Sequence, residues 1–224
     1  MKPTLDQGRK LLELVSQSGR SAKWVQEQLF GSGAFTDLLA VDDLEGVHRE
    51  SHRCFLGLPP LTPPLLEPFG TVTVPAIAER FVASEKFVVD TSKRARVKIG
   101  WLGSDFKCWF LGKTEEPVQE AILRCARLTR DAFDRDIREE IGTEFEETSL
   151  AQVYALMERQ PNGEAGKLLT NGRANTFCVR DIPGVLRAVR VSWLAGHDGW
   201  RVDACLVLSP NWWSDGDCVF FRNS

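Results

Sequence analysis

The N-terminal part of the chain carries apolar side chains at helical spacing. Leucines and a valine on one face predict a helix over residues 4–18, and the same reasoning predicts helices over 21–30 and 44–55. A dense set of prolines follows, at positions 59, 60, 63, 64 and 68. Because proline has no amide donor and disfavours helix in its predecessor, this segment indicates a boundary. We expect a helical module over 1–58, a Pro-rich linker over 59–80 and an α+β domain over 81–224.

The first half of the larger domain alternates apolar runs with turns. Residues 87–89 and 106–111 predict short strands, and alternation over 97–101 predicts a half-buried strand between them. Apolar residues on one face, with Pro117 in the first turn and Gly142 at the end, predict a helix over 117–142. A shorter helix is predicted over 149–159.

The C-terminal third has the alternation of an antiparallel sheet. Strands are predicted over 175–180, 189–193, 202–206 and 218–222, and Asp198-Gly199 is a hairpin signal between the second and third. Strand–helix–strand repetition is not visible, so a Rossmann fold or a TIM barrel is not expected. The fold class is therefore α+β.

Composition and charge narrow the class of protein. The chain has 224 residues, 43% of them hydrophobic, with a formal net charge of −3. This apolar fraction excludes wholesale disorder, and the weak negative charge disfavours nucleic acid as a partner. No apolar run is long enough for a membrane span, and polar residues interrupt the first twenty positions. A cytoplasmic location is expected, with leaderless export as the alternative.

Residues that commonly carry catalysis are sparse. The chain has three histidines, and no two of its six cysteines lie within four positions of each other, so zinc and redox motifs are absent. We expect reduced, packed thiols; a Cys205–Cys218 disulfide is open if the protein is exported. His48 and His52 share a helix face that is expected to be solvated. No catalytic residue, metal site or cofactor is predicted.

Tryptophan is concentrated near the C-terminus. The chain has seven, and four of them fall within the last 32 residues. Trp101 and Trp193 lie on the apolar side of alternating strands and are expected in the core. Trp212 and Trp213 are adjacent in a polar loop, where successive side chains point to opposite sides, so one is expected to anchor the loop.

Several motifs occur together from position 80 to the end. They are LLTNGRAN at 168–175, GVLRAV at 184–189, DGWRVDA at 198–204 and WSDGDCVFFRNS at 213–224. With residues 97–117, they resemble a family of uncharacterised bacterial proteins. That family is similar to the variable proteins of diversity-generating retroelements, in which mutagenesis rewrites the 3′ end of a gene. The resemblance implies a C-type-lectin-like domain that closes with a strand ending in Phe-Arg.

The same resemblance implies a non-enzymatic binding protein. Its diversified C-terminal face would recognise a macromolecular ligand, with a protein as the expected class, on a rigid scaffold like that of an antibody paratope. Carried over by position, the face comprises Trp200, Arg201, Asp203, Cys205, Leu208, Asn211, Trp212, Ser214, Asp217 and Cys218.

Three other functions remain open from the sequence. One is a small α+β enzyme or pocket protein of NTF2-like type, with a cavity lined by Trp109, Tyr154, Trp193 and Asp203. Another is calcium-dependent sugar binding, because Gln160-Pro161-Asn162 is similar to a carbohydrate-recognition triplet. The third is a toxin or effector, which no residue supports directly. A deep apolar cavity would favour the pocket protein, and an exposed C-terminal face would favour the binding protein.

Overall fold

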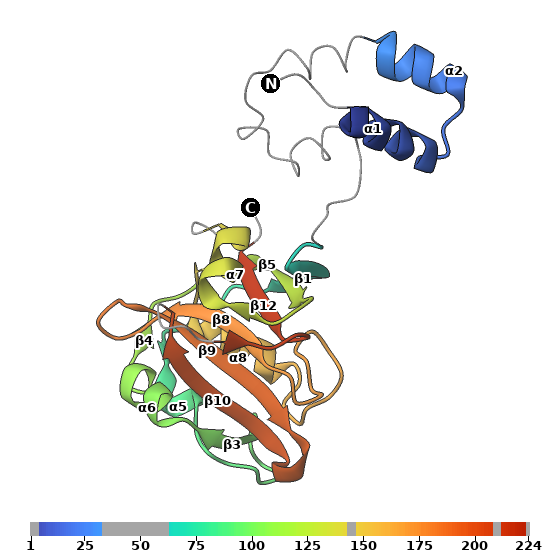
Figure 1. Ribbon diagram of the computed structural model, residues 1–224. Helices are drawn as coiled ribbons and strands as arrows, with labels where there is room; N and C mark the ends of the chain where they lie inside the picture. Colours follow the sequence, from blue (N-terminus) through green and yellow to red (C-terminus); the bar gives the residue numbers. More distant parts are fainter. Residues whose placement is uncertain (1–4, 33–62, 143–146, 208–211, 223–224) are drawn as a thin grey trace. The chain divides into compact units, whose positions relative to one another are not determined.

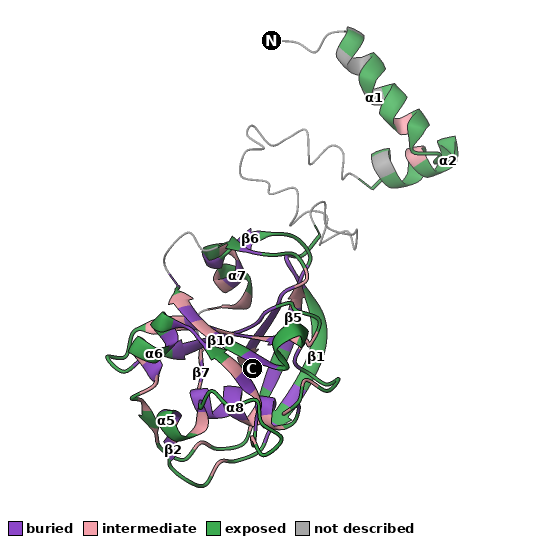
Figure 2. Cartoon of the chain, turned by 90° about the horizontal axis from the view of Figure 1, so that it is seen from below, coloured by how far each residue is buried: buried purple, intermediate pink, exposed green. Residues whose placement is uncertain are grey.

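The computed structural model describes residues 5–32, 63–142, 147–207 and 212–222. The chain divides into two compact units, Met1–Leu61 and Thr62–Ser224 (Figure 1). In the first unit, α1 (Leu5–Gln17) is followed by α2 (Ala22–Trp24) and the π-helical η1 (Val25–Phe30). The helices predicted over 4–18 and 21–30 are therefore confirmed, and the one over 44–55 lies outside the described residues. Most described residues of α1 are exposed (Figure 2).

The second unit is built on a mixed sheet. Its strand order is β1-β5-β12-β8-β9-β10-β3, with β7 beside β8. The strands are β1 (Leu66–Val74), β3 (Ile99–Leu102), β5 (Ala121–Leu128), β7 (Glu147–Thr148), β8 (Asn175–Arg180), β9 (Leu186–Leu194), β10 (Gly199–Leu206) and β12 (Cys218–Arg222). The pairs β10–β3, β12–β8 and β7–β8 are parallel, and the others are antiparallel.

Two hydrophobic clusters lie on opposite faces of this sheet. The larger packs one face against α5 (Ala83–Lys86), α6 (Ser104–Phe110), α8 (Leu150–Glu158) and the ribbon of β2 (Phe81–Val82) and β4 (Thr114–Glu115). The smaller packs the other face against α7 (Asp134–Ile141) and the ribbon of β6 (Ala132–Phe133) and β11 (Trp212–Trp213). Alternating strand residues therefore belong to different layers.

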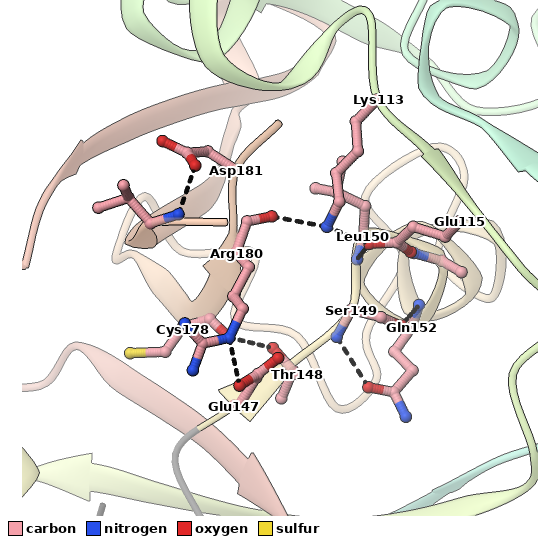
Figure 3. A network of polar contacts seen from close by, with 12 residues as sticks. Lys113, Glu115, Glu147, Thr148, Ser149, Leu150, Gln152, Cys178, Arg180 and Asp181 are labelled. Atoms are coloured by element: carbon pink, nitrogen blue, oxygen red, sulfur yellow. Dashed lines mark hydrogen bonds and ion pairs between the residues drawn. The ribbon is translucent and has the colours of Figure 1, made fainter. Parts of the chain in front are cut away.

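Helix α8 is buried along almost its whole length and is fixed at its N-terminus. Ser149 Oγ accepts from the Gln152 amide, and the Gln152 side chain accepts from the Ser149 amide, which makes a capping box. Glu115 on β4 adds a carboxylate that accepts from the Leu150 and Ala151 amides at 3.1 and 2.9 Å (Figure 3). Lys113 Nζ joins Glu115 to the Arg180 carbonyl, so this network ties α8 to β8.

Four predictions for the first half of this unit are wrong. The expected linker over 59–80 contains β1, and that nine-residue strand pairs with β5. Residues 117–142 form β5, β6 and only then a helix, α7, which ends at Gly142 as expected. Residues 106–111 belong mainly to α6, because Phe106 and Phe110, four positions apart, both enter the larger cluster. Residues 87–89 follow α5 and form no strand.

The C-terminal predictions are largely confirmed. β8, β9, β10 and β12 form where expected, and Asp198 closes the β9–β10 hairpin with a left-handed φ of 44°. The exception is the place of β12, which lies between β5 and β8 and runs parallel to β8. The fold class α+β is confirmed, with the sheet mixed rather than antiparallel. Among the described helices, none is long and apolar enough to cross a membrane.

Candidate binding groove

One face of the β9–β10 hairpin carries polar side chains instead of a hydrophobic cluster. Arg190 is paired with Asp203, and Ser192 with Arg201, across the two strands. All four therefore point to the same face, whereas Trp193 and Trp200 point to the larger cluster. With the loop before β8 and the turn before β12, these residues line a groove of about 310 Å³. We call it the arginine groove; it is lined by Gly172, Arg173, Ala174, Arg190, Ser192, Leu194, Arg201, Asp203, Ser214 and Asp217.

Two arginines of the groove are each held between an aromatic ring and a carboxylate. The Arg190 guanidinium lies 4.8 Å from the Trp213 ring centroid and 3.6 Å from Asp217 Oδ2. The Arg201 guanidinium lies 4.5 Å from the Trp101 ring centroid and donates to Asp203 Oδ2 at 3.2 Å. Each guanidinium has five N–H donors, so both keep donors that can reach a ligand.

Asp217 organises the floor of the groove. Its side chain is buried, and it accepts from the Ala174 amide at 3.0 Å and from the Ser214 amide at 3.3 Å. It thereby joins the loop before β8 to the turn before β12. Arg173 lies on that loop, and its side chain is exposed next to Gly216. In the described part of the chain, the Arg173 guanidinium has no hydrogen bond or ion pair.

A second hollow adjoins the arginine groove at the end of the hairpin. This glycine hollow, of about 370 Å³, is lined by Gly100, Trp101, Leu194, His197, Gly199, Trp200 and Arg201. A β-carbon on Gly199 would lie 2.7 Å from the Gly100 nitrogen, so only glycine allows the backbones of β3 and β10 to approach this closely. Leu194 and Arg201 line both depressions, so the two lie side by side.

The structure brings together only some of the residues predicted for a binding face. Four of them, Arg201, Asp203, Ser214 and Asp217, line the arginine groove. Cys205 points to the same face as Arg201 but packs against the smaller cluster. Trp212 is 54% exposed and lies against Phe133 with ring centroids 4.7 Å apart. Leu208 and Asn211 lie outside the described residues.

Two predicted face residues are instead part of the core. Trp200 and Cys218 are fully buried in the larger cluster, on the opposite face of the sheet from the groove. Trp200 Nε1 donates to the Gln160 carbonyl at 3.0 Å, so the one polar atom of the Trp200 side chain has a hydrogen-bond partner. The prediction for these two residues is wrong, because strand alternation turns them inward. The expectation that one of Trp212 and Trp213 anchors the loop is confirmed: Trp213 is buried and Trp212 is exposed.

Several residues of the site were missed from the sequence, and three of them shape its charge and stacking. Arg190 and Arg173 come from outside the terminal segment, and Trp101 comes from the parallel partner strand β3. Trp101 was expected in the core, but it is 42% exposed and carries the Arg201 guanidinium. Alternation along β9 was visible in the sequence, and it places Arg190 on the opposite face of the strand from Val189 and Val191. The pairing of β3 with β10 was not visible.

The described cysteines lie in different environments. Those at 108, 125, 205 and 218 are free thiols, and Cys54 is not among the described residues. Cys205 and Cys218 lie on opposite faces of the sheet, which excludes the disulfide between them in this structure. Burial raises the pKa of Cys205 to about 11. A hydrogen bond with Cys218 lowers the pKa of Cys125, and the same contact raises that of Cys218.

The alternatives from the sequence find little geometric support. Trp193 and Asp203 point to opposite faces of the sheet, so one cavity cannot be lined by both. Gln160 is buried, and its side-chain amide is used by backbone groups of Glu164 and Leu168, which leaves it no role as a calcium ligand. Among the described residues, no cluster of three or more His, Cys, Asp or Glu side chains has the arrangement of a metal site.

Comparison with protein-family models, with curated proteins and with solved structures finds no match for this chain, so its function has to be argued from the groove.

Proposed function

We propose that this chain is a non-enzymatic binding protein that recognises a protein partner through the arginine groove. The observation that carries the proposal is the gathering of Arg201, Asp203 and Ser214 on one solvent-facing surface. Their neighbours Trp101 and Trp213 hold arginines in fixed orientations. Arginine and tryptophan are the residues in which interface binding energy is concentrated.

The scaffold under the groove suits recognition. β9 and β10 are joined by eight paired positions, and their other face is buried in the larger cluster. Side chains on the groove face can therefore make contacts without a change in the fold. A preorganised surface loses less conformational entropy on binding.

The C-type-lectin-like fold and the retroelement origin belong to the same proposal. They are supported by the closing strand β12, which ends in Phe221-Arg222, and by the groove positions in the last part of the chain. In this proposal, variation falls on Arg201, Asp203, Ser214 and Trp212, while Trp200, Asp217 and Cys218 serve as scaffold. The coding locus tests it: an adjacent reverse transcriptase and an adenine-rich copy of the last codons are expected. A locus without either, invariant between isolates, would refute this origin.

Binding is tested by comparing variants in affinity capture from the source cells. The groove variant carries Arg173→Glu and Arg201→Glu, and Arg80→Glu is the matched control because Arg80 directly precedes β2, where it contacts Thr114 and Glu116 rather than any residue of the groove. A protein captured by the wild type and the control but lost with the groove variant is then purified, and its affinity is measured by calorimetry. Equal affinity for the wild type and the groove variant would refute the proposal.

A further inference from the structure

We infer that the arginine groove and the glycine hollow together bind an extended acidic peptide in which an acidic residue and an aromatic residue lie two positions apart. This inference rests on the proposed function and specifies the chemistry of its partner. It begins from the charges of the groove. Arg173, Arg190 and Arg201 supply three positive charges against the two negative charges of Asp203 and Asp217, a balance of 3 − 2 = +1.

The distribution of these charges favours a carboxylate ligand. Asp217 is buried below the surface, where two backbone amides and Arg190 already compensate it. Asp203 Oδ2 accepts from Arg201, and its Oδ1 accepts from the Ala204 amide. The surface that a ligand meets is thus dominated by guanidinium donors. Guanidinium groups bind carboxylates with paired hydrogen bonds, and this geometry is stronger than that of neutral donors.

The glycine hollow supplies a separate, apolar subsite. Gly199 lies two positions before Arg201 on β10, on the same face, and in the register of β3 Trp101 is the partner of Arg201. Residues two positions apart on a strand are about 6.6 Å apart. An extended peptide has the same repeat, so a carboxylate at Arg201 places the side chain two positions away at the glycine floor. There the exposed Trp101 ring and Leu194 offer apolar contact to an aromatic ring.

The experiment uses the full chain and a fluorescein-labelled peptide, Gly-Ser-Glu-Gly-Phe-Ser-Gly, with fluorescence anisotropy as the readout. Two comparison peptides replace Glu by Gln and Phe by Gly. We expect each replacement to weaken binding by about 10-fold, and we expect binding to the Glu peptide to fall as salt is raised. Arg201→Ala and Arg173→Ala should each weaken binding of the Glu peptide by about 5- to 10-fold, whereas Arg80→Ala should leave it unchanged.

The outcomes separate this inference from the proposed function. Equal binding of the Glu and Gln peptides, or equal binding by Arg201→Ala and Arg80→Ala, overturns the inference. So does tighter groove-dependent binding of single-stranded DNA of the same length. If a captured partner still depends on the groove in any of these cases, the proposed function stands and only the peptide chemistry is wrong. Arg173→Ala keeps the test decisive if Arg201→Ala fails to fold, because the Arg173 side chain is exposed.

Discussion

Asp217 offers a direct test of whether a C-terminal residue serves as scaffold or as binding face. We expect Asp217→Ala to destabilise the protein by about 2–4 kcal/mol. The buried Ala174 amide loses its acceptor, and a buried donor without a partner costs about 1–3 kcal/mol. The longer bond from the Ser214 amide adds less, since that residue is exposed and its amide can be rehydrated. The ion pair with partly exposed Arg190 contributes less than about 1 kcal/mol.

Urea unfolding and thermal melting measure this loss. A change of 2–4 kcal/mol corresponds to a decrease in Tm of about 4–16 °C for a domain of this size. Asp215→Ala is the matched control, because Asp215 is an exposed neighbour in the same turn, and its effect should stay within about 0.5 kcal/mol. Asp217→Asn should fall between the two, since it keeps one acceptor. If Asp217→Ala is as stable as Asp215→Ala, the scaffold role of Asp217 is refuted.

Three further predictions follow from single contacts. Gly163→Ala should lower the free energy of unfolding in urea by about 2–5 kcal/mol, because φ is +73° and a β-carbon would overlap the buried Trp193 indole. Gly172 is the control: its φ is +86° but a β-carbon there would meet open space, so Gly172→Ala should cost only about 1–2 kcal/mol. Equal losses for the two variants would contradict the overlap. Glu115→Ala should destabilise by about 2–4 kcal/mol because two helix amides lose their acceptor, against about 0.5 kcal/mol or less for exposed Glu116→Ala. Alkylation of Cys205 by iodoacetamide, followed by mass spectrometry, should reach half of its maximal rate near pH 11 in the folded protein but near pH 8.5 in urea. The same pH dependence of alkylation in both states would contradict the raised pKa of Cys205.

The sequence predicted local structure best where a side chain acts on its own backbone. Ser149 and Gln152 form the capping box of α8, and a helix was predicted to begin at that point. The error over 117–142 has the opposite cause. β5 carries apolar residues on both faces because Leu123 and Cys125 enter the larger cluster while Ala126 and Leu128 enter the smaller one, and this spacing can be mistaken for one face of a helix. The partners that decide between the two are about fifty and ninety positions away.

The candidate site shows the same limit. Alternation along β10 separates Arg201 and Asp203 from Trp200 and Val202, so the sequence contains the division into two faces. The sequence does not show which of the two faces is covered, because that depends on where the helices pack. Trp200 was therefore assigned to the binding face although it belongs to the core. Arg173 could not be predicted, because its loop reaches the groove through contacts with the distant turn before β12, such as the hydrogen bonds from the Ala174 amide to Asp217 and from the Cys218 amide to the Ala174 carbonyl.

The position of the groove follows from the unequal covering of the sheet. One face is packed by α5, α6 and α8 from β1 to β10, whereas the smaller cluster on the other face ends at Ala188 on β9 and at Cys205 on β10. Beyond Ala188, positions 190, 192 and 194 of β9 line the groove instead of entering the smaller cluster. A strand that is apolar on its other face tolerates such a polar stripe, because the buried side provides its stability. Changes at Arg201 or Ser214 therefore alter the groove and leave both clusters intact. This separation of recognition from folding is the physical condition that a variable binding face needs.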